Sequence, residues 1–190
     1  MTRRLLANAT ALVAEAERAN LDALHMKSLE GHGVEVKGGA SGAALGPEKA
    51  PWRELLLYDR AGGWRDDACA ALPTACAVLR DAPSIVGTPR LGDGSFCCRV
   101  EILRLAPGGR VLPHTAPTNA RLKAHVGLST PPGYAASLSV AGERRAWRDG
   151  DVFVFDDSFF HEAGNEHASV PRYVLSVDFW KPALGPFDVG

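Results

Sequence analysis

The chain has 190 residues, of which 46% are hydrophobic and 23% are charged, and 21 basic against 22 acidic side chains leave a formal net charge of -1. This composition is that of an ordinary globular protein with one domain, or one domain with a helical extension. A general nucleic-acid-binding protein would be far more basic, so we expect no nucleic-acid partner. No apolar run approaches the roughly 18 residues that cross a bilayer, so no membrane span is expected.

Residues 1–48 are expected to form a helix followed by a glycine-rich loop. Apolar side chains recur at helical spacing from Leu5 to Ala16, within an expected helix over 3–26. Polar residues interrupt this stretch from Asn8 onward, whereas a secretory signal peptide needs an unbroken apolar segment of about 7–15 residues. We therefore expect an amphipathic helix and a cytoplasmic protein. Residues 30–48 are rich in Gly, Ser and Ala and predict a surface loop.

Residues 49–190 are expected to form a β-domain on which the N-terminal part packs as one structural unit. The apolar run 52–58 leaves helix and strand open, and 65–80 predicts a helix broken or kinked at Pro73. Farther along, short β-like runs alternate with turns that contain Gly or Pro, as in a sandwich or a barrel. The expected strands are 96–105, 122–128, 136–140, 145–147, 152–155 and 173–179.

The four cysteines are too few for a disulfide scaffold, and no CxxC pair indicates a structural zinc site. Cys69 and Cys76 lie seven residues apart, on either side of Pro73. A disulfide and two buried free thiols are both open for this pair.

Two of the histidines in the β-rich part, His114 and His161, are candidate metal ligands. Imidazole is the commonest neutral metal ligand, and a histidine pair on a β-scaffold is typical of non-haem iron sites. The usual carboxylate two residues after the first histidine is missing, because that position is Ala116. The nearest acidic side chains are those of Asp156, Asp157 and Glu162. The ordinary alternative for each histidine is a hydrogen-bonded structural role.

Positive charge also gathers in this part of the chain. Arg121, Lys123 and His125 alternate along one expected strand, so all three can project from the same face. Such a group indicates an anionic ligand, because an unpaired buried charge is costly. The alternative is a solvated outer face, with the intervening Leu122, Ala124 and Val126 toward the core. Arg172 stands at the start of the last expected strand.

Two long motifs resemble those of the aspartyl/asparaginyl β-hydroxylase family. The first is HTAPTNARLKAHVGL over 114–128, and the second is GDVFVFDDSFFHE over 150–162. The segment 173–182 resembles the closing strand of the family, and Trp52 and the spacing of Cys69 and Cys76 also resemble its catalytic domain. The likeness covers roughly 50–184, and two long motifs in the right order make it specific.

The resemblance implies a mainly β fold with flanking helices, a cupin-like jelly roll (double-stranded β-helix) with an N-terminal helical part. It also implies a dioxygenase that hydroxylates its substrate with Fe(II), 2-oxoglutarate and O2. In this family two histidines hold the iron without a carboxylate, which agrees with Ala116. Matching positions imply His114 and His161 as iron ligands and catalytic residues, Trp52, Lys123, His125 and Arg172 as 2-oxoglutarate contacts, and Arg121 as a substrate contact.

The substrate implied by the resemblance carries an acidic or amide side chain, in a protein, a peptide or a small molecule. The chain departs from the family at Lys123, where an arginine is usual, and at Leu103, where a serine hydroxyl is lost. Lys keeps the charge but loses the two-pronged contact of a guanidinium. Both departures favour an alternative, a jelly-roll binding module without catalytic activity. A small residue at 116 also suits an iron-dependent halogenase, which is a further alternative.

Overall fold

The computed structural model describes residues 1–29, 34–36, 51–59, 61–86 and 98–181. The helical elements are α1 (Thr2–Ala19), the 3-10 helix η1 (Leu21–Ala23), α2 (Asp66–Ala71), α3 (Pro73–Arg80) and α4 (Pro83–Val86). The strands are β1 (Lys27–Ser28), β2 (Val34–Val36), β3 (Trp52–Asp59), β4 (Gly63–Trp64), β5 (Val100–Leu105), β6 (Gly109–His114), β7 (Arg121–Ser129), β8 (Ala136–Val140), β9 (Glu143–Ala146), β10 (Val152–Phe155), β11 (His161–Asn165) and β12 (Arg172–Trp180).

The strands form two antiparallel sheets. The large sheet has the order β1-β3-β5-β12-β7-β10, with β4 paired to β3, and the small sheet has the order β2-β6-β11-β8-β9. The eight strands from β5 to β12 are therefore shared equally between the sheets, with β5-β12-β7-β10 in one and β6-β11-β8-β9 in the other. This exchange of strands between two facing sheets is the topology of a jelly roll, so the predicted fold class is confirmed.

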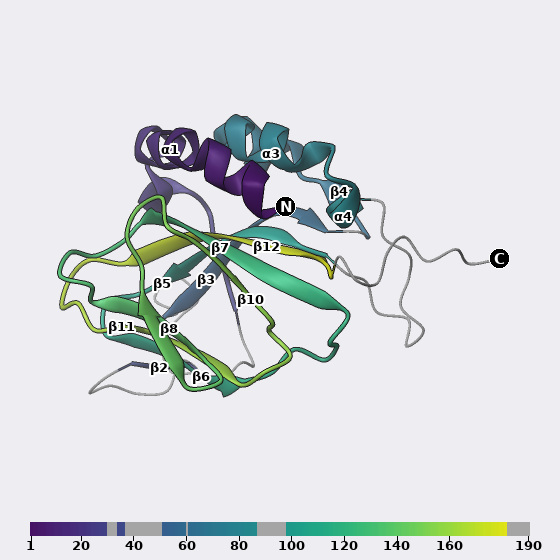
Figure 1. Ribbon diagram of the computed structural model, residues 1–190. Coiled ribbons are helices and arrows are strands. Elements are labelled where there is room, and N and C mark those ends of the chain that lie inside the picture. The colour runs from purple at the N-terminus through teal and green to yellow at the C-terminus, as the bar shows by residue number, and fades with distance from the viewer. Residues whose placement is uncertain (30–33, 37–50, 60, 87–97, 182–190) are drawn as a thin grey trace.

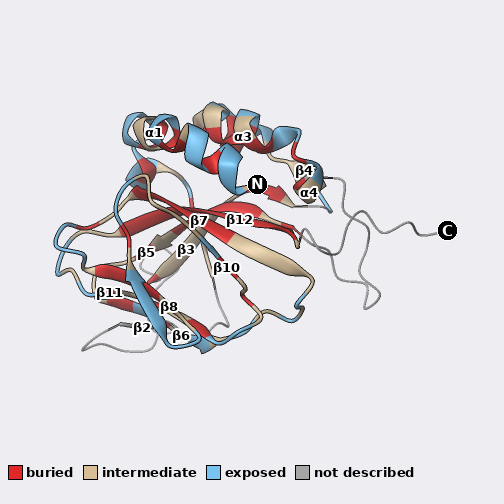
Figure 2. Cartoon of the chain, in the orientation of Figure 1, coloured by how far each residue is buried: buried red, intermediate tan, exposed pale blue. Residues whose placement is uncertain are grey.

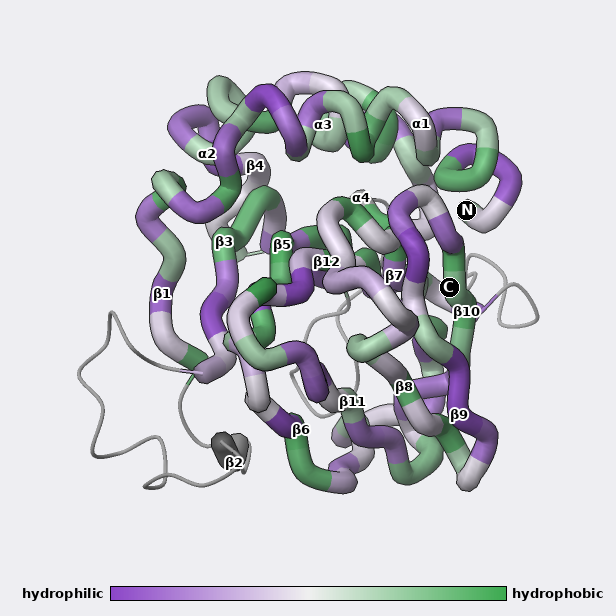
Figure 3. Tube along the Cα trace, turned by 90° about the vertical axis from the view of Figure 1, so that its left-hand side faces the viewer, coloured by the Kyte–Doolittle hydropathy of each residue, from purple (hydrophilic) through white to green (hydrophobic). Residues whose placement is uncertain are grey.

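The helices cover the outer face of the large sheet, and the small sheet lies on its other side (Figure 1). Figure 3 shows the same three layers from a view turned by 90°. Leu5 and Leu12 of α1 are buried in one cluster with Leu79 of α3 and with Val126 and Leu175 of the large sheet. This cluster explains why the chain needs an amphipathic N-terminal helix, since the outer face of β7 and β12 is apolar.

A second apolar cluster lies between the two sheets. It includes Leu105, Leu138, Trp147 and Val174. Every residue of β12 is buried, because its alternating side chains enter the outer cluster on one face and the space between the sheets on the other (Figure 2). The inner cluster fills only part of that space, and the rest is the cavity described below.

The predicted N-terminal helix is present but shorter than 3–26. It ends at Ala19 because Asn20 takes a left-handed conformation with φ 47°, which Asn tolerates better than most residues. The predicted break at Pro73 is confirmed, since α2 ends at Ala71 and Pro73 opens α3, where a missing N–H is harmless. The segment 52–58, left open by its pattern, is a strand.

Each of the six expected strands matches an observed one within a few residues, although 96 and 97 lie outside the described part. Strands β6 and β11, which carry the two candidate ligands, were not predicted. β6 contains Pro113, and β11 contains Gly164 and ends at Asn165, residues that are rare in strands. Within the expected loop 30–48, β2 pairs with β6, and the remaining residues lie outside the described part. The boundary at residue 48 lies there too and stays a prediction.

Cys69 and Cys76 form a disulfide that joins α2 to α3, with an S–S distance of 2.07 Å. Of the two states left open by the sequence, the structure has the bonded one. Disulfides persist mainly in oxidising compartments, so the cytoplasmic location stays a prediction. Among the described residues, no helix combines the length and the apolar character needed to cross a membrane.

Candidate active site

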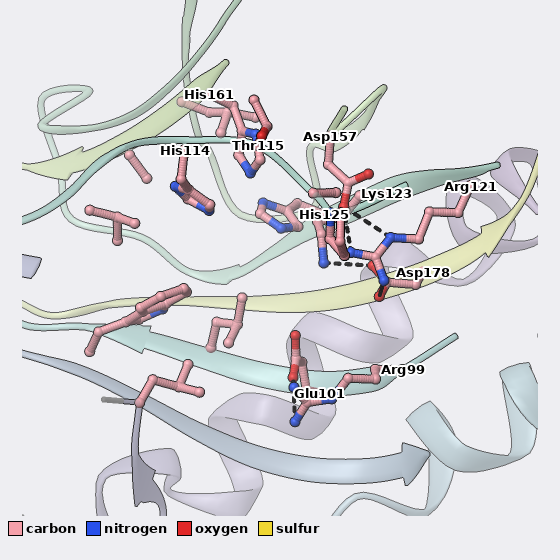
Figure 4. A pocket seen from close by; sticks show the side chains of 18 of the residues that line it. Arg99, Glu101, His114, Thr115, Arg121, Lys123, His125, Asp157, His161 and Asp178 are labelled. Atoms are coloured by element: carbon pink, nitrogen blue, oxygen red, sulfur yellow. Dashed lines mark hydrogen bonds and ion pairs between the residues drawn. The ribbon is translucent and has the colours of Figure 1, made fainter. Parts of the chain in front are cut away.

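A cavity of about 270 Å³ lies between the two sheets (Figure 4). Its lining includes side chains from β3, β5, β7 and β12 of the large sheet and from β6, β8 and β11 of the small sheet. All seven residues that the sequence placed in a site line it: Trp52, His114, Arg121, Lys123, His125, His161 and Arg172. The two departures from the family, Lys123 and Leu103, and the small Ala116 line the same cavity.

His114 and His161 enter the cavity together from the small sheet. They end β6 and begin β11, and these antiparallel strands place the two residues directly opposite each other. Their ring centroids are 4.2 Å apart, and the rings are tilted by 50°. The Trp52 ring lies 6.4 Å from the His114 ring on the side of the large sheet.

Both imidazoles are oriented by backbone carbonyls. The Nδ1 of His114 lies 2.8 Å from the Leu112 oxygen, and the Nδ1 of His161 lies 3.0 Å from the Phe159 oxygen. Because a carbonyl can only accept, each Nδ1 carries the hydrogen, and in the neutral ring the lone pair is then on Nε2. Burial lowers the pKa of His161, which favours that neutral form. Such backbone contacts are how proteins commonly orient metal-binding histidines.

The three acidic alternatives for a third ligand are engaged elsewhere. Asp156 pairs with Lys181 at 2.5 Å, and Glu162 pairs with Arg110 at 2.5 Å. Asp157 lines the cavity, but its Oδ2 lies 3.0 Å from the Nη2 of Arg121. In the described part of the chain no group of three or more His, Cys, Asp or Glu side chains is placed to hold a metal. A metal at this place would therefore have two protein ligands and several open positions.

Arg172 is a buried cation without a carboxylate partner among the described residues. It is 1% exposed, and its Nε has no hydrogen-bond partner in this part of the chain. Its guanidinium lies over the Trp147 ring, 4.8 Å from the centroid. Burial lowers the pKa of Arg172 to about 9, and no acid in the described ranges raises it again. A cation in such surroundings is a binding site for an anion, because pairing would offset the cost of its desolvation.

His125 is a second polar group that the fold leaves unsatisfied. It is 5% exposed, and within the described residues neither ring nitrogen has a hydrogen-bond partner. Its ring stacks on Trp147 at 5.8 Å and meets Phe155 edge-on at 5.1 Å. Burial, followed by the charges of Lys123 and Arg172, holds its pKa well below the ordinary value, so the ring is neutral. Its two nitrogens are available to a ligand in the cavity.

Arg121 and Lys123 project into the cavity as their alternation on β7 predicted, and both are ion-paired. Asp178 of β12 lies 2.9 Å from the Nη1 of Arg121 and 2.6 Å from the Nζ of Lys123. Burial is the largest single influence and acts to lower the pKa of both cations, but Asp178 and the other nearby carboxylates together outweigh it and raise both. The intervening Leu122, Ala124 and Val126 pack in the outer cluster, so both faces of this strand are covered.

Comparison with known proteins identifies the family. The model of the aspartyl/asparaginyl beta-hydroxylase family matches residues 7–182. The chain belongs to this family.

Two relatives show the extent of the likeness. The human aspartyl/asparaginyl beta-hydroxylase is 34% identical over 139 residues, which are 73% of this chain and 17% of the human protein. The mouse aspartate beta-hydroxylase domain-containing protein 1 is 35% identical over 138 residues, which are 72% of this chain and 36% of the mouse protein. The chain therefore matches only a minor part of each relative.

Two solved cupin structures are similar in shape. The cupin domain of Cnp3 from Schizosaccharomyces pombe has a TM-score of 0.45 at 7% identity, covering 86% of this chain and 73% of that one. A sugar phosphate isomerase of the cupin superfamily from Silicibacter pomeroyi has a TM-score of 0.45 at 18% identity, covering 85% and 74%. The fold assignment itself rests on the strand order of the two sheets.

This member of the aspartyl/asparaginyl β-hydroxylase family has cavity residues that sequence reasoning missed. Arg99, Glu101 and Asp178 line the cavity, and none was singled out. A signal for Asp178 was available, because alternation along β12 puts residues 172, 174, 176 and 178 on one face. Glu101 shares a face with Leu103 in the same way. An acidic residue that alternates with Leu103 and Leu105 on one face of β5 was the sign that this face lines a polar cavity.

Proposed function

We propose that this chain is a hydroxylase that uses iron(II) and 2-oxoglutarate. The observation that carries the proposal is Arg172, a buried guanidinium without a carboxylate partner in the described chain, in the same cavity as two histidines whose Nδ1 atoms face backbone carbonyls. A dicarboxylate that also chelates a metal satisfies both features at once. Membership in a family of β-hydroxylases supports the same reaction.

In this proposal His114 and His161 hold iron(II), and Arg172 pairs with one carboxylate of 2-oxoglutarate. Iron(II), 2-oxoglutarate and O2 together would supply the oxidation of a substrate C–H bond to an alcohol. The neutral His125 donates to or accepts from the cosubstrate. Lys123, which lies between His125 and Arg121 along β7, adds a positive charge between the cosubstrate and the substrate group. Apolar side chains such as Leu103 and Trp52 limit the water in the cavity, which strengthens these charged contacts.

The proposed substrate group lies toward Arg121. Arg172 and Asp178 are six residues apart on β12, roughly 20 Å at the usual strand rise, so the partners of Arg121 and the cosubstrate anchor are at opposite ends of the cavity. Figure 4 shows Arg121, Lys123 and Asp178 together on one side and the two histidines on the other. The arrangement suits an acidic or amide side chain, in a peptide, a protein or a small molecule.

The deciding experiment is an anaerobic titration of the metal-free protein with iron(II) and then with 2-oxoglutarate. We expect the visible charge-transfer band of the iron chelate in the wild-type protein and in His25→Ala, whose histidine is exposed and far from the site in sequence. His114→Ala and His161→Ala should lack the band while keeping the unfolding transition of the wild type. An equally strong band in either variant would contradict the ligand assignment. No band in the wild type at high ligand concentration would favour the binding-module alternative.

A further inference from the structure

The substrate end of the cavity is rich in carboxylates. Glu101, Asp157 and Asp178 line it together with Arg99, Arg121 and Lys123, and Glu54 pairs with Arg99 from just outside the lining. Each of these cations has a carboxylate oxygen 2.6–3.2 Å away. An anionic substrate group would therefore have to share these three cations with four fixed carboxylates. Because acidic side chains outnumber basic ones at this end, a cationic ligand group fits it better.

Glu101 is a carboxylate with one oxygen that makes no hydrogen bond in the described chain. It is 6% exposed, lines the cavity from β5, and its Oε2 has no hydrogen-bond partner in the described chain. The Nη2 of Arg99 lies 3.2 Å from that oxygen without hydrogen-bond geometry, and it is closer to Glu54, at 2.6 Å. We regard the Glu54 contact as the main partner of Arg99 because it satisfies the geometric criterion of a hydrogen bond.

Asp157 repeats this feature on the other side of Arg121. Its Oδ2 accepts from Arg121, whereas its Oδ1 has no partner among the described residues, and the side chain is 1% exposed. Buried acceptors without donors are rare in folded proteins because each costs about 1–3 kcal/mol. Asp178 has a third such oxygen, Oδ1, which lies 2.6 Å from the Nζ of Lys123 but makes no hydrogen bond in the described chain. Three such oxygens on residues that line one cavity indicate that the ligand brings donors.

The charged groups around Glu101 come from β3, β7 and β12 and from the residue just before β5. Arg99 and Lys123 are the nearby cations, and Asp178 and Glu54 are the nearby acids. Burial is the main cause that raises the pKa of Glu101 to about 7, against the pull of the two cations. The Glu101 carboxyl group is therefore only partly ionised at neutral pH. A further positive charge beside this group would favour its ionised form.

We propose that Glu101 binds a protonated amine of the substrate, so that the substrate class carries an ammonium group beside the carboxylate or amide expected at Arg121. An ammonium is a compact cation with three donors, which matches a carboxylate oxygen without a donor. The cavity of about 270 Å³ is at the small end for ligand sites, so a small substrate group fits beside the cosubstrate. This inference rests on the proposed function, because it assigns the substrate of the same cavity.

The test compares pairs of probes that differ only in the amine. Protein with iron(II) and 2-oxoglutarate is titrated anaerobically, by calorimetry, with L-aspartate and with N-acetyl-L-aspartate. A second pair is an N-acetylated, C-amidated Asp-Lys dipeptide and the same dipeptide with acetyl-lysine. We expect at least a tenfold tighter Kd for the amine form of one pair, and the pair that shows it identifies an α-ammonium or a side-chain ammonium.

The Glu101→Gln variant should reduce this preference to less than threefold and leave the Kd of 2-oxoglutarate unchanged. The matched control is Glu54→Gln, which removes the other acid beside Arg99 but does not line the cavity, and it should keep the preference. In the wild type the amine probe should bind up to tenfold tighter at pH 8 than at pH 6, because Glu101 ionises over this interval. The glutamine variant should lose this pH dependence.

Equal binding of both members of each pair by the wild type would overturn the proposal, as would a preference that persists in Glu101→Gln. The charge-transfer band of the same samples reports separately on the proposed function. If the band is absent, the metal and cosubstrate assignment fails, and titration of the metal-free chain with the same probes still measures whether Glu101 selects amines.

Discussion

Arg172 and Glu101 are opposite charges on the inner face of the large sheet, and the fold leaves both incompletely paired. Among the described residues, Arg172 lies over the Trp147 ring without a carboxylate partner, and Glu101 has one oxygen without a hydrogen-bond donor. Burying a charge without a full partner lowers stability, so such residues are retained for what they bind. Their positions toward different ends of the cavity suit a cosubstrate anion at one and a substrate cation at the other.

Replacing Arg172 with Met should separate stability from binding. The ligand-free variant should unfold at the same free energy as the wild type or up to about 2 kcal/mol higher, because a desolvated cation is removed from an apolar site. Its Kd for 2-oxoglutarate should rise about 10- to 100-fold, since a charge-assisted contact contributes about 1.5–3 kcal/mol. Urea unfolding with and without 2-oxoglutarate measures both. The exposed Arg144→Met is the control, and an unchanged Kd in Arg172→Met would reject the anchor role.

Glu101→Gln should also change how stability depends on pH. The raised pKa of about 7 means that the folded state holds this proton more tightly than the unfolded state, whose ordinary value is 4.5. The buried acid therefore costs almost nothing below about pH 4.5, its cost grows between about pH 4.5 and 7, and it is fully present above 7. The difference of 2.5 units (7 - 4.5) corresponds to about 3 kcal/mol.

We accordingly expect the glutamine variant to be close to the wild type in free energy of unfolding at pH 5 and more stable by about 2–3 kcal/mol at pH 8. Urea unfolding at the two pH values measures this difference. The exposed Glu17→Gln on α1 serves as the control and should shift both values equally. A glutamine variant that gains nothing at pH 8 would show that Glu101 is fully paired in the folded protein.

Strand β7 supplies three charged or polar groups to the cavity, and its path depends on Gly127. A Cβ at this position would lie 2.3 Å from the backbone oxygen of Arg148, in the turn that leads into β10. Gly127 also exchanges backbone hydrogen bonds with Gly150 and Asp151 of that turn. The turn is thus held directly against the strand, and only glycine leaves room for it.

Gly127→Ala should therefore lower the free energy of unfolding by about 1–3 kcal/mol, the usual cost of overpacking. Because the clash is with backbone, the strand should shift, and the Kd of 2-oxoglutarate should rise with it. Gly164→Ala on β11 is the matched control, since a Cβ there meets nothing within 4 Å. Urea unfolding and the 2-oxoglutarate titration compare the two, and equal effects would show that the Arg148 turn can move freely.

The two faces of the large sheet have different roles, because one packs against the helices and the other lines the cavity. The helices and the outer cluster lie on one side, and the inner cluster and the cavity lie on the other. The residues that line the cavity come from strands and the segments between them. The helical layer therefore acts on the site only by holding the large sheet in place.

Leu12→Ala on α1 tests this separation. Leu12 is fully buried in the outer cluster, so its truncation should lower the free energy of unfolding by about 2–5 kcal/mol. The Kd of 2-oxoglutarate should stay within a factor of two, measured where the variant is folded. Leu6→Ala, on the exposed face of the same helix, should change the stability by less than about 0.5 kcal/mol. A weakened Kd in Leu12→Ala would mean that the helical layer shapes the cavity.

Local pattern alone predicted a large share of this protein. Alternation along β7 placed Arg121, Lys123 and His125 on one face, and the helical period of the N-terminus predicted α1. The break at Pro73 followed from the chemistry of its ring. The long motifs around His114 and His161 indicated the family and, through it, the jelly roll. These features are readable because side-chain period and backbone restriction act within a few residues.

Other features arise only when distant segments pair. β6 and β11 have weak strand patterns, and each becomes a strand because its neighbours in the small sheet complete its hydrogen bonds, which brings His114 opposite His161. Likewise the local sequence pattern does not show which of Arg121 and Arg172 is ion-paired. The fold pairs the first with Asp157 and Asp178 and leaves the second with an aromatic ring. Charge compensation depends on which strands are neighbours, and strand order is a property of the whole chain.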